Sequence, residues 1–90
     1  MWDLIGKEVT FTFKAQKNAT VQVAGDFNNW MPEDLHSTDT PSGPKWQKVV
    51  WLNRGSYQYK YLLDGVWITD PTNFETVQNS FGGQNSLIAI

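Results

Sequence analysis

Apolar and polar residues alternate with a period of two along most of the chain. In residues 8–14, Val9, Phe11 and Phe13 fall on one face, and threonines fall on the other. Such alternation is typical of a β-strand that buries one face. Further runs with this alternation or with a β-branched and aromatic bias are residues 20–24, 46–52, 57–63, 66–69 and 87–90.

Turn-forming residues separate these runs. Arg54-Gly55 is expected to be a turn, Asp64-Gly65 is a strong signal for a two-residue hairpin, and Asp70-Pro71 ends the return strand. Residues 31–45 combine prolines with small polar residues and predict a long polar loop. Residues 72–83 predict a second loop, which has room for one short strand.

The spacing of these elements predicts the fold class. No segment shows a convincing helical period of apolar residues. Many short strands at close spacing instead predict an all-β fold, an antiparallel β-sandwich of the immunoglobulin-like kind with about six to eight strands. A chain of 90 residues is the size of one domain, so residues 1–90 are expected to form a single sandwich.

The Asp64-Gly65 turn sets the register of its hairpin. It places Leu63 opposite Val66, Leu62 opposite Trp67, Tyr61 opposite Ile68 and Lys60 opposite Thr69. The face richer in apolar area is predicted to face the core, and it carries Tyr57, Tyr59, Tyr61, Leu63, Val66 and Ile68. Trp67 and Lys60 lie on the other face, so the register predicts an outward tryptophan beside a lysine.

Aromatic residues are frequent, with five tryptophans, five phenylalanines and three tyrosines in 90 residues. Burying them stabilises a small core, and Trp46 is expected there, with Trp2 as an edge plug. The pattern leaves open which face of the Trp46 strand is inside, and so whether Trp51 is buried. Core packing is also an alternative for Trp30 and Trp67 when each is considered alone.

An exposed indole is a suitable platform for a sugar. One face of a glucose ring carries C–H groups and can lie flat on an indole, which removes apolar area from water at roughly 25 cal/mol per Å². The hydroxyl groups at the rim of the ring need donors and acceptors such as Lys, Asn, Gln and Thr. Two tryptophans set at an angle fit a curved α-1,4-glucan better than a straight chain. Trp30, Lys60 and Trp67 with neighbouring asparagines supply such a set.

Composition and charge argue against several classes of function. Without cysteine the chain has no disulfide and no thiolate metal site, which fits a reducing compartment, and we expect the cytoplasm. No signal peptide is visible, and no apolar run is long enough to cross a membrane. A net charge of −2 with Arg54 as the one arginine argues against a nucleic-acid-binding face.

The sequence does not predict an enzyme. Glycoside hydrolysis needs two carboxylates that flank a cleft, whereas Asp26, Asp64 and Asp70 adjoin turns. His36 is the one histidine and is expected to be solvated in a loop. Neither a nucleophile-elbow motif nor a calcium-loop spacing is present. We therefore expect no catalytic residue, no metal and no cofactor.

A resemblance to a known family rests on three stretches in this order: GDFNNW (25–30), GSYQYKYLLDGVWITDP (55–71) and GGQNSLIAI (82–90). They resemble the family 48 carbohydrate-binding modules. That family includes the glycogen-binding domain of the AMP-activated protein kinase β subunit and the N-terminal early-set domains of isoamylases and glycogen branching enzymes. The resemblance covers about residues 8–90 and implies an early-set, immunoglobulin-like sandwich.

The resemblance also implies a glucan site. The family's two stacking tryptophans match Trp30 and Trp67, and the lysine of its Y-K-F/Y motif matches Lys60. The asparagine before its last strand matches Asn85, and its apolar loop residue matches Phe81. These matches imply non-catalytic binding of α-1,4-glucans such as glycogen, starch and maltooligosaccharides. The alternative is an early-set interaction domain that docks onto a glucan-active catalytic domain or a kinase without binding sugar itself.

Overall fold

The structure is a computed structural model that describes residues 5–90. These residues form nine strands and one short 3₁₀ turn: β1 (Gly6–Lys14), β2 (Val21–Gly25), η1 (Asp26–Asn28), β3 (Glu33–Asp34), β4 (His36–Thr40), β5 (Gly43–Asn53), β6 (Ser56–Leu63), β7 (Val66–Ile68), β8 (Thr76–Gln78) and β9 (Gln84–Ala89). The all-β prediction is confirmed, with one strand more than the expected maximum. The expected edge plug, Trp2, lies outside the described residues.

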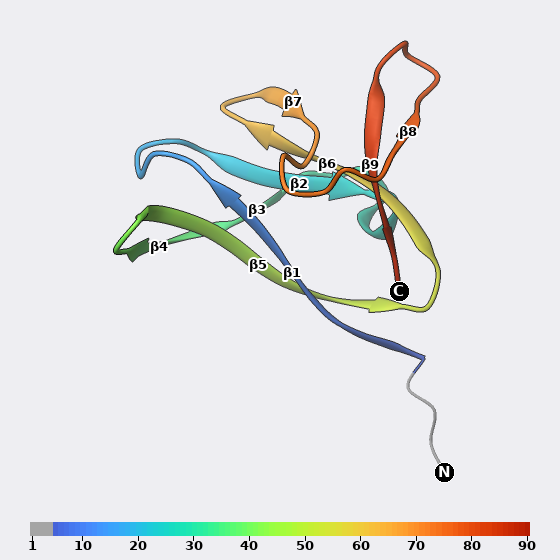
Figure 1. The fold of residues 1–90 in the computed structure, drawn as a ribbon, viewed down its shortest axis with the longest axis horizontal. Coiled ribbons are helices and arrows are strands. Elements are labelled where there is room, and N and C mark those ends of the chain that lie inside the picture. Colours follow the sequence, from blue (N-terminus) through green and yellow to red (C-terminus); the bar gives the residue numbers. More distant parts are fainter. Residues whose placement is uncertain (1–4) are drawn as a thin grey trace.

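The strands form two antiparallel sheets that face each other (Figure 1). The smaller sheet has the order β1-β5-β4, and the larger has the order β3-β2-β6-β9-β8. β6 is the central strand of the larger sheet: its first half pairs with β9, and its second half pairs with β7. This change of partner along β6 leaves a junction between β7 and β9 on the larger sheet.

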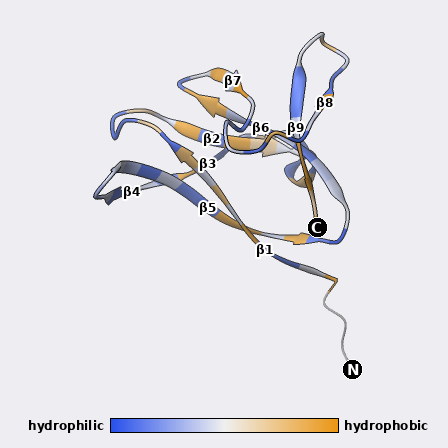
Figure 2. Ribbon diagram, viewed as in Figure 1, coloured by the Kyte–Doolittle hydropathy of each residue, from blue (hydrophilic) through white to orange (hydrophobic). Residues whose placement is uncertain are grey.

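The core lies between the two sheets and takes residues from both. Its buried apolar side chains are Phe11, Phe13, Val21, Val23, Leu35, Leu52, Tyr59 and Tyr61. Figure 2 shows the corresponding hydrophobic stretches in β2 and β6, whereas β4 is largely hydrophilic. The alternation in residues 8–14 therefore predicted the buried face of β1 correctly.

The long loop predicted for residues 31–45 is wrong. This segment contains β3, β4 and the start of β5, and β4 pairs with β5 through a tight turn in which Thr40 faces Gly43. β4 lies at the edge of its sheet and has no buried residue. An exposed edge strand can be polar on both faces, so its composition resembles that of a loop. His36 is therefore exposed as expected, although it lies on a strand.

The predicted hairpin is confirmed. Asp64 and Gly65 adopt φ angles of 48° and 84°, which two-residue turns of this kind require. Three of the four predicted pairs are present: Leu63–Val66, Leu62–Trp67 and Tyr61–Ile68. The fourth, Lys60–Thr69, does not form because β7 ends at Ile68. The predicted core face is also confirmed except at Val66, which is 61% exposed. Val66 follows the turn on a strand that pairs only with β6, so it has few neighbours to cover it.

The structure settles which face of β5 is inside. Leu52 is buried, and Trp46 is half-buried against the core as expected, with its Nε1 donating to the backbone oxygen of Gln16 at 3.3 Å. Val49 and Trp51 lie on the opposite face, and Trp51 is 52% exposed. The Trp51 indole is thus on the outer face of the smaller sheet.

Candidate functional site

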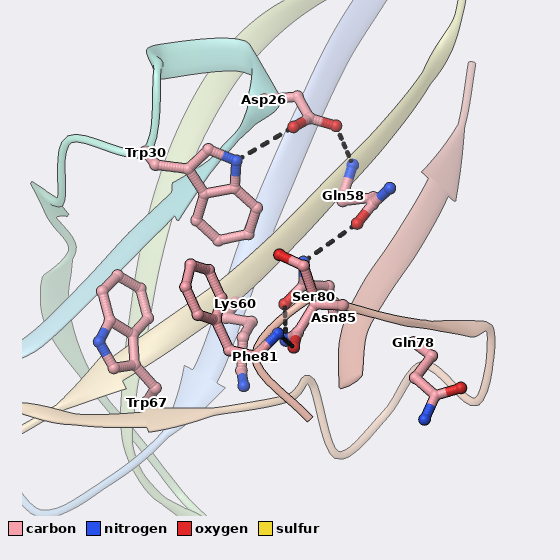
Figure 3. Close-up of a pocket in the computed structure, with 10 residues that line it drawn as sticks. Asp26, Trp30, Gln58, Lys60, Trp67, Gln78, Ser80, Phe81 and Asn85 are labelled. Carbon is pink, nitrogen blue, oxygen red and sulfur yellow. Dashed lines mark hydrogen bonds between the residues drawn. The ribbon is translucent and has the colours of Figure 1, made fainter. Parts of the chain in front are cut away.

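A groove of about 690 Å³ lies on the larger sheet at the junction between β7 and β9 (Figure 3). All five residues predicted for the site line it: Trp30, Lys60, Trp67, Phe81 and Asn85. Its other lining residues are Asp26, Gln58, Gln78, Asn79 and Ser80. The fold therefore brings together residues that come from four separate parts of the sequence.

The GDFNNW stretch forms one wall of the groove through a turn that is anchored in the core. A Cβ atom on Gly25 would meet the backbone oxygen of Gln58 at 2.5 Å, so this close approach to β6 requires glycine. Phe27 stacks on Phe11 of the core, with ring centroids 5.1 Å apart. The Asn28 carboxamide oxygen accepts the backbone N–H of Gly25 at 2.9 Å and closes the turn.

The turn holds Trp30 in a defined orientation. Asn29 and Trp30 adopt left-handed φ angles of 57° and 59°, a conformation that is uncommon for a bulky residue. The Trp30 Nε1 donates to Asp26 Oδ1 at 3.0 Å, and Asp26 Oδ2 accepts the backbone N–H of Gln58 at 2.8 Å. One carboxylate thus ties the indole to the central strand, as Figure 3 shows. Asparagine tolerates the left-handed region best after glycine, which accounts for Asn29 at this position.

Trp67 forms the next part of the wall. Its ring centroid is 6.2 Å from that of Trp30, and the two ring planes meet at 62°. The indole is 45% exposed, which confirms the outward orientation predicted from the hairpin register. Two indoles at this angle present a bent apolar surface to the groove.

Lys60 lies on the same face of the sheet, beside the junction. It is half-buried, as expected for a lysine whose aliphatic stem packs on a surface while its ammonium group remains accessible. Within residues 5–90 the ion pairs are Lys17–Asp39 and Lys48–Glu33. The Lys60 ammonium group therefore has no carboxylate partner among these residues, and its donors are available to a ligand.

Asn85 lies in the floor of the groove and is 8% exposed. Its Nδ2 donates to Gln58 Oε1 at 3.0 Å, and its Oδ1 accepts from Asn79 Nδ2 at 3.1 Å. Hydrogen bonds to protein thus fix the orientation of the carboxamide. One of its two N–H groups remains for a ligand.

Phe81 stands at the opposite rim of the groove, in the loop between β8 and β9. Its side chain is 95% exposed. Such exposure of a large apolar side chain carries no packing benefit for the folded chain. In addition to the two indoles, the Phe81 ring gives the groove a third aromatic surface.

Three residues that position the groove side chains were not predicted from the sequence: Asp26, Gln58 and Asn79. Asp26 was assigned to turn chemistry, which the structure confirms, but its contact with the indole was not foreseen. Gln58 could have been found from the period of two, because it shares a face with Lys60 on β6. The signal for Asn79 was the turn-forming sequence around it, which did not reveal its partners.

The groove does not contain the groups that glycoside hydrolysis requires. Asp26 is the one carboxylate among the described residues that line it, whereas the reaction uses two carboxyl groups.

Tyr59 and Tyr61 lie on the core side of β6, and burial raises the pKa of both phenols well above the ordinary value. Among residues 5–90, no group of three or more His, Cys, Asp or Glu side chains is placed to hold a metal ion.

Comparison with known proteins identifies the family. A family model described as the glycogen recognition site of AMP-activated protein kinase matches residues 7–90. The chain belongs to this family. The resemblance to carbohydrate-binding modules that the sequence motifs indicated is thereby confirmed.

No helix in the described part of the chain is long and apolar enough to cross a membrane.

Curated relatives agree with this assignment. The chain is 31% identical over 101 residues to the chloroplastic phosphoglucan phosphatase LSF1 of Arabidopsis thaliana, covering 99% of the chain and 17% of that protein. It is 34% identical over 70 residues to the 5'-AMP-activated protein kinase subunit beta-1 of Sus scrofa, covering 78% of the chain and 53% of the relative. It is also 34% identical over 73 residues to the beta-2 subunit of Mus musculus, covering 78% of the chain and 24% of the relative. The chain thus spans about half the length of these relatives or less.

Proposed function

We propose that this chain is a non-catalytic module that binds α-1,4-glucans such as glycogen, starch and maltooligosaccharides. The observation that carries the proposal is the pair of indoles, Trp30 and Trp67, tilted at 62° in one groove. Membership of a family described as a glycogen recognition site supports the choice of ligand. The name of the plant relative, a phosphoglucan phosphatase, points to the same class of polysaccharide.

The proposed mechanism combines stacking with hydrogen bonds. Successive glucose rings lie against the two indoles and follow their angle, because the α-1,4 linkage turns the chain at each residue. The Lys60 ammonium group and the remaining N–H of Asn85 donate to sugar hydroxyl groups. An open groove leaves other hydroxyl groups in water, so we expect a dissociation constant on the order of 10 μM to 1 mM.

A second candidate function is docking onto a kinase or a glucan-active catalytic domain. The observation that favours it is that the relatives are longer proteins, among them kinase subunits, of which this chain covers only a part. In this account the exposed tryptophans contact protein, and residues 1–90 act as one module of an assembly. The cytoplasmic location stays a prediction, since the name of one relative places that protein in the chloroplast.

Affinity electrophoresis tests the proposal against the alternative. Native gels cast with glycogen should retard the protein, and gels cast with hydroxyethyl cellulose should not. The Trp51→Ala variant is a matched control, because Trp51 is as exposed as Trp67 but lies on the other sheet. It should be retarded like the parent. If glycogen retards neither protein, the docking function is favoured and glucan binding is refuted.

A further inference from the structure

A continuous chain of hydrogen bonds crosses the floor of the groove from one wall to the other. It runs from the Trp30 indole through Asp26, Gln58 and Asn85 to Asn79, and at Gln58 it passes from the backbone N–H to the side-chain oxygen. Figure 3 shows its links around Asp26, Gln58 and Asn85. Each member is held by its neighbours, so the two walls of the groove are connected through polar contacts.

Asn79 ends this chain and organises the loop that carries Phe81. Its Oδ1 accepts the backbone N–H of Phe81 at 2.9 Å and that of Gly83 at 3.0 Å. Its own backbone N–H donates to the Gly83 oxygen at 2.9 Å. Asn79 thus closes the loop with its side chain and its backbone, and joins it to Asn85 through Nδ2.

Phe81 cannot be positioned by packing, because its side chain is 95% exposed. Its place at the rim therefore depends on the backbone of the loop. We infer that Asn79 is the positioning residue of the glucan site: it fixes the Phe81 loop and couples it to the groove floor at Asn85. This inference rests on the proposed glucan binding. A loop ordered in the free protein avoids the loss of conformational freedom on binding, which strengthens the complex.

Substitutions at Asn79 separate its two roles. Asn79→Ala removes the acceptor for Phe81 and Gly83 and the donor to Asn85. Asn79→Asp keeps the acceptor for Phe81 and Gly83 but lacks the donor to Asn85 Oδ1. Ser80→Ala is the control, because Ser80 lines the same groove without a side-chain hydrogen bond to the rest of residues 5–90.

Amide hydrogen exchange in the free protein tests the positioning without any sugar. In Asn79→Ala the amides of Phe81 and Gly83 should exchange several-fold faster than in the parent. In Asn79→Asp and in Ser80→Ala their exchange should stay near the parental rate. Unchanged exchange in Asn79→Ala overturns the inference, whatever the protein binds.

Titration with β-cyclodextrin tests the consequence. Asn79→Ala should weaken binding about twofold to tenfold, the range for losing one net hydrogen bond. If Asn79 acts through Phe81, the double variant with Phe81→Ala should bind no more weakly than Phe81→Ala alone. Full additivity of the two effects overturns the inference, since Asn79 then contributes independently of Phe81. If the parent does not bind, the proposed function fails, and amide exchange still decides whether Asn79 fixes the loop.

Discussion

Replacing Trp67 with alanine should remove most of the glucan affinity. The indole is 45% exposed, and a tryptophan side chain offers about 250 Å² of surface, so roughly 110 Å² faces the groove. A stacked glucose ring covers about half of this and loses a similar apolar area of its own. At about 25 cal/mol per Å² the contact is worth about 2.8 kcal/mol. Affinity should therefore fall about a hundredfold, which takes an already weak complex beyond ordinary detection.

The same substitution should leave the fold intact. Removing a core tryptophan typically lowers the free energy of unfolding by about 3–5 kcal/mol. Trp67 instead lies on the outer face, where its one aromatic contact within residues 5–90 is with Trp30 at 6.2 Å. An aromatic pair contributes about 0.5–1.5 kcal/mol beyond its area burial, so loss of this contact alone should lower the melting temperature by no more than about 12 °C.

Calorimetric titration with β-cyclodextrin and a melting curve on the same sample check both numbers. Trp51→Ala provides the control, with the same residue type at 52% exposure on the opposite sheet, and should bind like the parent. The reasoning is refuted if Trp67→Ala binds normally, or if both variants lose binding equally. A drop in melting temperature beyond about 15 °C would instead identify Trp67 as a structural residue.

Three further predictions concern other parts of the molecule. Lys60→Ala should weaken glucan binding by about twofold to tenfold in the same titration, because it removes one hydroxyl contact in a wet groove; an effect as large as loss of an indole contradicts this role. Gly25→Ala should lower the free energy of unfolding, measured in urea, by about 1–3 kcal/mol. The reason is that the alanine Cβ would lie 2.5 Å from the backbone oxygen of Gln58. Burial raises the pKa of Tyr59 and Tyr61 in the folded state, so the unfolded chain loses its tyrosine protons at a lower pH than the folded chain does. The free energy of unfolding should therefore keep its full value below about pH 10 and fall as the pH rises further. Melting curves at pH 8 and 11 test this, and Tyr61→Phe should reduce the difference between them.

The parts of the fold that the sequence predicts best are those in which local chemistry and burial agree. Asp64-Gly65 specifies a tight turn, and the turn alone fixes which residues of β6 and β7 share a face. The outward orientation of Trp67 follows from that register. Val66 was misplaced because period-two alternation gives the face of a residue but not whether the opposing layer reaches it.

Other features depend on contacts that no local pattern contains. β4 is polar on both faces, and only its pairing with β5 makes it a strand. The site was predicted partly from the hairpin register and partly from family resemblance, which together pointed to five of the residues that line the groove but not to the hydrogen bonds beneath them. Asn79 and Asn85 are six positions apart in a loop and a strand, and their contact depends on how that loop folds back.

Calorimetric titration of the parent protein with maltoheptaose and with cellohexaose tests the central claim most directly. The account predicts a dissociation constant for maltoheptaose on the order of 10 μM to 1 mM and no heat of binding for cellohexaose. The reason is the 62° angle between Trp30 and Trp67, which a curved α-1,4 chain can follow and a straight β-1,4 chain cannot. Equal binding of the two oligosaccharides, or binding of cellohexaose alone, would contradict it.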